Sequence, residues 1–299
     1  EDFINDVKNW IIKKGTWTIN HPLVINGNLK IEKGVSLKFS KKAYLIIKGQ
    51  LIANGSKAHR INLSSLNDSW KGLYVLNSDK ESKLTNISIN NVTSLSDGIL
   101  NLTGGVTFYK ANVFMDNVKL SNGLEEDFLN IVDSKYNLNN MIINRTISDA
   151  IDFDFSEGKI NNIKLFDIEG DALDFSGGFS LISNTELFDV KDKAISAGEE
   201  AIVEILDAKI YDTGVGIASK DGSRVYVANT SITNSKLSPA MTYVKKSYYT
   251  APSLIIESSD IDIDRIISQN GTNVIFDEFK LPTQIVNVEE LYNSSVMKK

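Results

Sequence analysis

The sequence predicts an all-β fold, a parallel solenoid in which the chain winds through coils of about 22 residues. Apolar residues recur at a constant step of 22 between Leu129 and Ile217, and Asn140 and Asn162 stand one such step apart in a polar column. Between these columns apolar and polar residues alternate over four to six positions, which is typical of strands. The repeat contains no helical segment and no leucine-rich consensus, so a leucine-rich repeat is excluded.

The first 15 residues are expected to form a short helix that caps the solenoid. Phe3, Ile4, Val7 and Ile11 fall on one face of this helix, and Gly15 ends it. A cap is needed because the exposed strand edges of a solenoid pair with other chains. The opposite face is not rich in basic residues, which favours a cap over a helix that lies on a membrane surface.

Residues 16–280 are expected to form the solenoid, and residues 281–299 a C-terminal cap or tail. Roughly 11 coils, stacked at about 4.8 Å, make a rod of about 50 Å. The repeat is less regular in residues 27–75, where short apolar segments are separated by glycines.

Residues 27–39, 45–47 and 70–75 resemble the opening coils of right-handed parallel β-helix proteins, and this resemblance covers roughly residues 16–275. It implies a protein of the carbohydrate-active kind, in which an extended polymer lies across the coils and calcium is a common helper. Residues 149–154, Asp-Ala-Ile-Asp-Phe-Asp, resemble the Asp-Gly-Ile-Asp-Pro-His-Asp segment of β-helix mannuronan C5-epimerases. The catalytic His of that family is absent here, and the signatures of polygalacturonases and pectate lyases are absent too.

Composition excludes several classes of function. A net charge of −6 disfavours nucleic acid as a partner, and no apolar run is long enough to cross a bilayer. The absence of Cys excludes disulfides and Cys nucleophiles, and the presence of only His21 and His59 disfavours a His-based triad or a multi-His metal site. The chain begins at Glu1 without Met, so we expect a processed or truncated piece. The resemblance implies a secreted, periplasmic or cell-surface location.

Acidic residues gather where strand alternation points them away from the core. Asp152 and Asp154 alternate with inward apolar residues, and Asp174 follows Asp152 by one period, which places the two about 4.8 Å apart. Like charges this close must share a proton, recruit a cation or lie beside a base. Turn preference explains Asp149 and Asp171 at the bends, but Asp is depleted within strands, so a solvated turn face explains the other three poorly.

These residues are expected to lie on one exposed polar strip. The candidate catalytic residues are Asp152, Asp154, Asp174, Lys193, Glu199, Lys220 and Asp221. The candidate substrate-binding residues are Arg224, Tyr243, Lys245 and Lys246. The candidate metal ligands are Asp149, Asp152, Asp154, Asp171 and Asp174, whose oxygens suit calcium better than zinc.

Two classes of function remain open. In the first, the protein acts on an acidic polysaccharide by lyase or epimerase chemistry, with Lys220 or Tyr243 removing the uronate C5 proton while the acids, alone or through calcium, stabilise the enolate-like intermediate. A hydrolase variant needs two carboxylates about 5 to 9 Å apart around the bond. In the second, the chain is a non-catalytic glycan-binding module, adhesin or structural rod of a larger exported protein. A cleft in which the acids and lysines converge favours the first.

Overall fold

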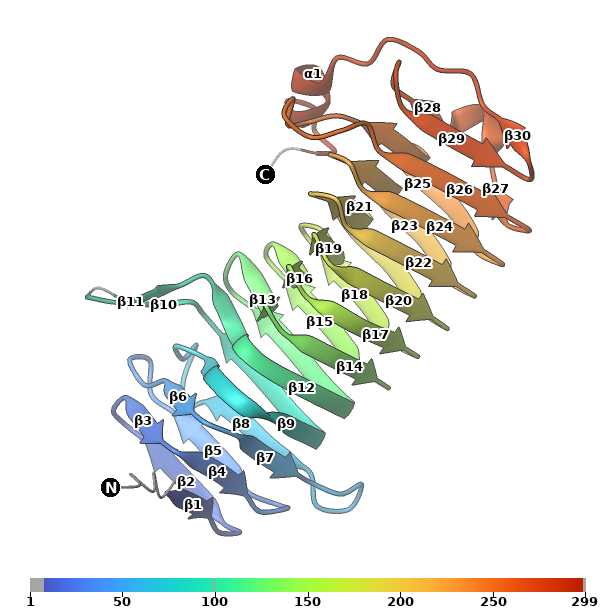
Figure 1. Ribbon diagram of the computed structural model, residues 1–299. Coiled ribbons are helices and arrows are strands. Elements are labelled where there is room, and N and C mark those ends of the chain that lie inside the picture. The colour runs from blue at the N-terminus through green and yellow to red at the C-terminus, as the bar shows by residue number, and fades with distance from the viewer. Residues whose placement is uncertain (1–7, 99, 298–299) are drawn as a thin grey trace, which may run out of the picture.

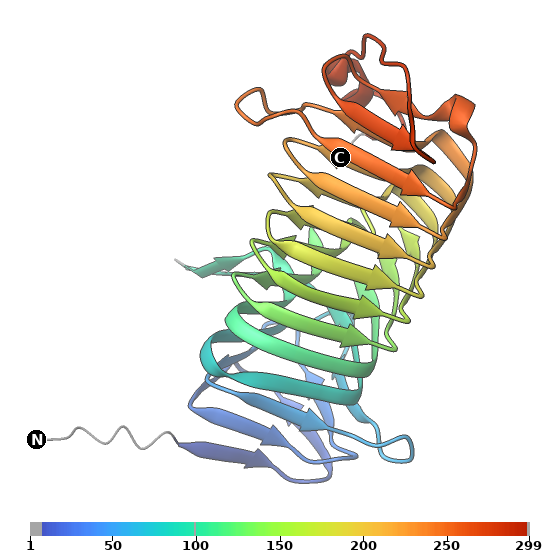
Figure 2. The same cartoon turned by 45° about the vertical axis from the view of Figure 1, so that its right-hand side comes forward.

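The structure, a computed structural model, describes residues 8–98 and 100–297 (Figure 1). Across these residues the chain forms a right-handed parallel β-helix of about 12 turns, which confirms the predicted fold class. The coils stack into one rod that runs from the N-terminal to the C-terminal strands (Figure 2). None of the helices in this part of the chain has the length and apolar character needed to cross a membrane.

Each complete coil contributes one strand segment to each of three sheets, which we call faces A, B and C. Face A comprises β3 (Leu23–Asn26), β6 (Leu45–Lys48), the first parts of β9 (Leu73–Val92) and β12 (Gly104–Gly123), β13 (Asp127–Val132), β16 (Asp149–Asp154), β19 (Leu173–Ser176), the last parts of β21 (Glu186–Gly198), β23 (Lys209–Lys220) and β25 (Ser231–Tyr243), and β28 (Ile267–Ser268).

In each complete coil, faces B and C follow face A. Face B comprises β1 (Asn9–Ile12), β4 (Asn28–Ile31), β7 (Leu51–Asn54), the middle parts of β9 and β12, β14 (Lys135–Asn139), β17 (Glu157–Asn161), β20 (Phe179–Ser183), β22 (Ile202–Leu206), β24 (Arg224–Ala228), β26 (Ser253–Glu257) and β29 (Asn273–Phe276). Face C comprises β2 (Thr16–Ile19), β5 (Ser36–Phe39), β8 (Ile61–Ser65), the last parts of β9 and β12, β15 (Ile142–Thr146), β18 (Lys164–Ile168), the first parts of β21, β23 and β25, and β27 (Asp260–Ile261).

The remaining elements lie outside this repeat. They are the antiparallel hairpin of β10 (Leu95–Asp97) and β11 (Leu100–Leu102), the 3₁₀ turn η1 (Ile263–Arg265), β30 (Phe279–Lys280), which pairs antiparallel with β29, and the short helix α1 (Val288–Tyr292).

The strand register follows the period found in the sequence. On face A, Ile151 pairs with Leu173, which pairs with Ile195 one coil later. Like residues therefore stack along the interior, and the rings of Phe153 and Phe175 lie parallel with centroids 4.7 Å apart. The core is one continuous apolar column because every coil repeats the same inward positions.

Asparagines make the bend between faces B and C. Asn140, Asn162 and Asn184 have φ angles of 53°, 54° and 51°, in the left-handed region that Asn tolerates better than most residues. The side-chain amide of Asn162 donates to the amide oxygen of Asn140 at 2.6 Å. The polar column of the sequence is therefore a column of turns.

The predicted N-terminal helix is wrong where the structure describes it. Asn9–Ile12 form β1, which pairs with β4 in parallel, and Ile12 packs against the core. An isolated helix of this length is marginal in water, whereas a strand gains the backbone partners of an existing sheet edge. Phe3, Ile4 and Val7, which were expected on the apolar face of that helix, lie outside the described residues.

Two segments cover parts of the outer side of face A. Near the N-terminal end, Leu95 of the β10–β11 hairpin packs against Tyr74. Near the C-terminal end, Tyr292 and Met297 pack against Tyr243, so the C-terminal segment folds back over the later coils. Between these covers, β16 and β19 keep their outward side chains partly exposed.

The stacked core makes a prediction about stability. Phe175→Ala should lower the free energy of unfolding by about 3–5 kcal/mol, because a fully buried ring leaves a cavity beside Phe153. Urea denaturation measures this loss. Phe179→Ala, on face B and 38% exposed, is the matched control and should cost less than about 1 kcal/mol. Equal losses in the two variants would contradict the stacked core.

Candidate functional site

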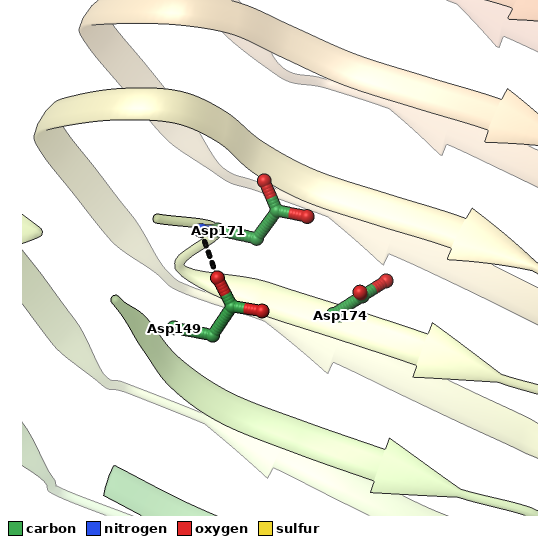
Figure 3. A group of neighbouring side chains, drawn as sticks. All are labelled: Asp149, Asp171 and Asp174. Carbon is green, nitrogen blue, oxygen red and sulfur yellow. Dashed lines mark hydrogen bonds between the residues drawn. The ribbon is translucent and has the colours of Figure 1, made fainter. Parts of the chain in front are cut away.

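Asp149, Asp171 and Lys193 stand in one column at the bend that leads into face A. A carboxylate oxygen of Asp149 accepts the backbone N–H of Asp171 at 2.8 Å (Figure 3). A carboxylate oxygen of Asp171 accepts the backbone N–H of Lys193 at 2.9 Å. Each carboxylate thus binds the backbone of the next coil. Such charge-assisted hydrogen bonds explain how the two acids remain buried.

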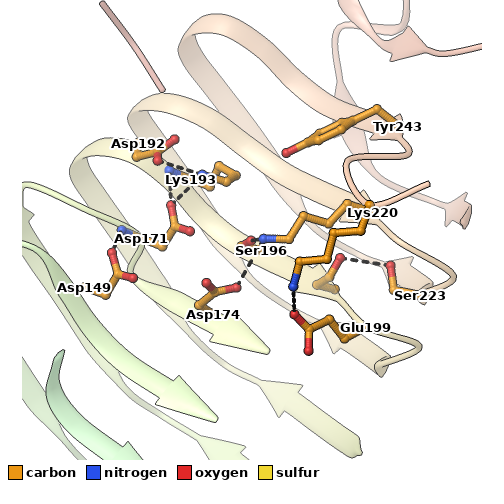
Figure 4. Close-up of polar contacts among 12 residues, drawn as sticks. Asp149, Asp171, Asp174, Asp192, Lys193, Ser196, Glu199, Lys220, Ser223 and Tyr243 are labelled. Atoms are coloured by element: carbon orange, nitrogen blue, oxygen red, sulfur yellow. Dashed lines mark hydrogen bonds and ion pairs between the residues drawn. The ribbon is translucent and has the colours of Figure 1, made fainter. Parts of the chain in front are cut away.

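Lys193 closes this column with a buried positive charge. Its Nζ lies 3.0 Å from Asp171 Oδ1 and 2.7 Å from Asp192 Oδ2, with 1% of the side chain exposed (Figure 4). Burial lowers the pKa of Lys193, but Asp171 and Asp192 outweigh it, and the pKa is raised. Lys193 is therefore an ammonium that neutralises the column, and the expectation of an exposed Lys193 is wrong.

Three of the five predicted metal ligands converge. Asp149, Asp171 and Asp174 each bring one carboxylate oxygen within 4.8 Å of the other two (Figure 3). Three hard oxygen donors fit calcium by their chemistry. The Lys193 ammonium already contacts Asp171, however, so the protein itself supplies positive charge on that side.

Asp152 and Asp154 form a pair on the open part of face A. The side-chain amide of Asn130, one coil earlier, donates to Asp152 Oδ2 at 3.0 Å and to Asp154 Oδ2 at 3.3 Å. Burial and then the nearby carboxylates, with Asp127 first, raise the pKa of Asp152 well above its usual range. Burial also raises the pKa of Asp154, although hydrogen bonds from Asn130 and Asp152 partly offset it. The pair therefore holds a proton to higher pH than free aspartates do, with Asp152 as donor and Asp154 as acceptor.

Asp174 and Lys220 form an ion pair beside these acids. Lys220 Nζ donates to Ser196 Oγ at 2.7 Å and lies 3.6 Å from Asp174 Oδ1 (Figure 4). The side chains of Lys220 and Asp174 are 12% and 17% exposed. Burial lowers the pKa of Lys220, but Asp174 together with Tyr292 and Asp171 outweighs it, and the pKa is raised. Lys220 is thus an ammonium, which cannot remove a proton from a substrate.

Glu199 contacts the side chain of Lys246, whereas Asp221 contacts the backbone of Lys245 and Lys246. Glu199 forms an ion pair with Lys246 at the edge of the strip, and both side chains are partly exposed (Figure 4). Asp221 is fully buried, and one of its oxygens accepts the backbone N–H groups of Lys245 and Lys246, each at 2.7 Å. Asp221 therefore holds the backbone at Lys245 and Lys246 in place and does not face the strip.

Two predicted substrate-binding residues lie elsewhere. Tyr243 is fully buried beneath the C-terminal segment, its hydroxyl 2.8 Å from that of Tyr292, and burial raises its pKa. Arg224 is exposed on β24, in face B. Lys245 lies with its Nζ 4.3 Å from the centroid of the Tyr292 ring. The expected strip is thus only partly exposed, because residues outside the repeat cover its C-terminal half.

Asn130 is a residue that sequence reasoning missed. It pairs with Asp152 in the strand register, and Asp152 pairs with Asp174. The 22-residue period alone places Asn130 in this column, so extending the acidic column back by one coil would have found it.

The buried charge cluster predicts that substitutions of two nearby lysines lower the free energy of unfolding by very different amounts. Lys193→Met should lower the free energy of unfolding by about 3–5 kcal/mol, because Asp171 and Asp192 lose their buried counter-ion. Lys191→Met breaks only a surface ion pair with Asp189 and should cost less than about 1 kcal/mol. Denaturant unfolding measures both, and similar losses would refute the role of Lys193.

The raised pKa of Asp152 predicts how stability depends on pH. The folded state binds the Asp152 proton more tightly than the unfolded state, where the pKa is about 3.9, so stability falls as pH rises above that value. Asp152→Asn removes this loss. Its melting temperature should match the wild type at about pH 3.5 and exceed it at neutral pH. Asp207→Asn, an exposed turn position with φ of 55°, is the control and should show no such pH-dependent gain.

The sequence matches no protein-family model and no curated protein. The crystal structure of the periplasmic alginate epimerase AlgG is similar, with a TM-score of 0.58 and 10% identity over 92% of this chain and 79% of that chain. A single mutant of AlgG gives a TM-score of 0.61 and 11% identity over the same shares. The catalytic domain of a GH87 alpha-1,3-glucanase gives a TM-score of 0.48 and 12% identity over 86% of this chain and 64% of that one. At these identities the likeness to AlgG shows the fold, a right-handed parallel β-helix.

Proposed function

We propose that the open part of face A binds an acidic polysaccharide and acts on it by proton transfer at uronate residues. The observation that carries this proposal is the Asp152–Asp154 pair, two carboxyl groups with raised pKa values on a partly exposed surface, next to Asp174 and its Lys220 counter-ion. Groups whose environments push their proton affinities apart are typical of acid–base catalysis. The fold of the alginate epimerase AlgG supports the choice of a polyuronate.

Each charged group has one role in the proposed reaction. The Lys220 ammonium, already near the surface, binds the uronate carboxylate and stabilises the negative charge that develops there. Asp154, as the ionised member of the pair, is the base for the C5 proton, because a carboxylate with a raised pKa is a stronger base. Asp152 is the acid. This assignment replaces Lys220 and Tyr243 as candidate bases.

Elimination balances with these groups alone. The C5–H bond breaks, its proton goes to Asp154, and its electron pair stays on C5 as a carbanion next to the carboxylate. This pair forms the C4–C5 double bond as the C4–O bond breaks, and the leaving oxygen takes the proton of Asp152. In epimerisation the C5 carbanion takes the Asp152 proton instead, and the glycosidic bond survives.

Calcium and an exported location belong to the same proposal. Calcium held by Asp149, Asp171 and Asp174 would add positive charge beside the uronate carboxylate. The periplasmic origin of AlgG supports a secreted, periplasmic or cell-surface location.

The test is a panel of polyuronates and neutral polysaccharides, each incubated with calcium and with a chelator. We expect 4,5-unsaturated ends or inverted C5 centres from a polyuronate, and at least about a hundredfold loss of rate in Asp154→Asn. Product absorbance and proton NMR measure these outcomes. The rate of Asp207→Asn, an exposed turn variant, should stay unchanged.

Other results would contradict the proposal in distinct ways. New reducing ends without unsaturation would indicate a hydrolase that uses the same carboxyl pair. Binding without any product would indicate a glycan-binding module. Full activity in Asp154→Asn would remove that residue from the reaction.

A further inference from the structure

Phe155 occupies a backbone position that disfavours its own side chain. It belongs to the column of residues that turns the chain from face A to face B, and all of these have positive φ. From Lys110 onward the column is Lys110 (48°), Asp133 (46°), Phe155 (48°), Gly177 (73°), Glu199 (54°) and Asp221 (50°). The left-handed region is unfavourable for a bulky aromatic residue, while Gly, Asn and Asp accept it readily. Phe155 is therefore the residue of this column that fits the left-handed backbone conformation least well.

Burial does not explain why Phe stands there. Phe155 is 62% exposed, so most of the ring gains nothing from the core. Its neighbour one coil later is Gly177, where an added Cβ would lie 2.8 Å from Phe155 Cδ1. The absence of a side chain at Gly177 therefore leaves room for the aromatic ring at the surface.

Phe155 comes directly after the acid pair in the chain. Phe155 follows Asp154 at the end of β16, and its backbone N–H donates to the carbonyl of Ser176 at 2.7 Å. Ser176 is in turn the strand partner of Asp154. A rigid, hydrogen-bonded segment thus holds an exposed aromatic ring at the rim of the open part of face A.

We propose that Phe155 is a stacking platform for a pyranose ring of the bound polysaccharide. The inference rests on the proposed function and identifies the subsite beside its acid pair. One face of a pyranose presents C–H groups, which pack against an aromatic ring and gain apolar contact while the hydroxyls stay hydrated. This contact carries no charge, so it attracts a sugar even where the Asp154 and Asp174 carboxylates repel an anionic polymer. The bound ring then places the adjoining sugar over Asp152 and Asp154.

Phe155→Asn separates this role from a structural one. Asn suits the left-handed backbone, so the variant should melt at the same temperature as the wild type or higher. Binding of a polyuronate oligosaccharide, measured by calorimetry, should weaken about tenfold, and KM should rise with little change in kcat. Phe155→Trp should restore affinity. Phe179→Asn, an exposed Phe on face B, is the matched control and should bind as the wild type does.

The outcomes also separate this inference from the proposed function. Unchanged affinity in Phe155→Asn, while Asp154→Asn still loses turnover, would overturn the platform and leave the function intact. A lower melting temperature in Phe155→Asn would show that the ring stabilises the fold and would also overturn it. A wild-type protein that binds no member of the polysaccharide panel would overturn both proposals.

Discussion

In a parallel β-helix each side chain lies about 4.8 Å from the side chain of the same column in the next coil. This spacing favours repeated apolar rings and amides, as in the stack of Phe153 on Phe175, but it forces repeated acids together. The column of Asp149 and Asp171 meets the constraint with backbone hydrogen bonds and the buried Lys193 ammonium. Asp152 and Asp154 meet it through raised pKa values, which keep a proton on the pair to higher pH. The geometry that builds the core therefore also generates the acid–base chemistry.

The regular part of the fold was predictable because solenoid contacts join residues one period apart. The step from Ile151 to Leu173 is visible in the sequence and becomes a strand pair in the structure. The helix expected over residues 1–15 was wrong for β1, where the edge of an adjacent sheet outweighs a local helical pattern. The burial of Tyr243 was not predictable either, since the covering residues, including Tyr292 and Met297, belong to no repeat.

The candidate site, too, was predictable only in the part that follows from the repeat. Strand alternation correctly placed Asp152, Asp154 and Asp174 on the outer side of face A. It carried no information about the proton affinity of Lys220, which depends on its burial and on the nearby negative groups, with Asp174 foremost. These groups keep Lys220 a cation, which suits a carboxylate and not the role of a base. Phe155 adds an uncharged contact at the rim of a surface that otherwise offers mostly charge.

The central claim is that Asp152 and Asp154 retain a shared proton in the folded protein. Carbon-13 NMR of aspartate carboxyl groups, followed through a pH titration of the intact chain, tests it directly. We expect both carboxyl resonances to titrate above the usual Asp value of about 3.9, and the one that titrates at the higher pH should be missing in Asp152→Asn. Ordinary titration of both wild-type carboxyls near that value would contradict the account.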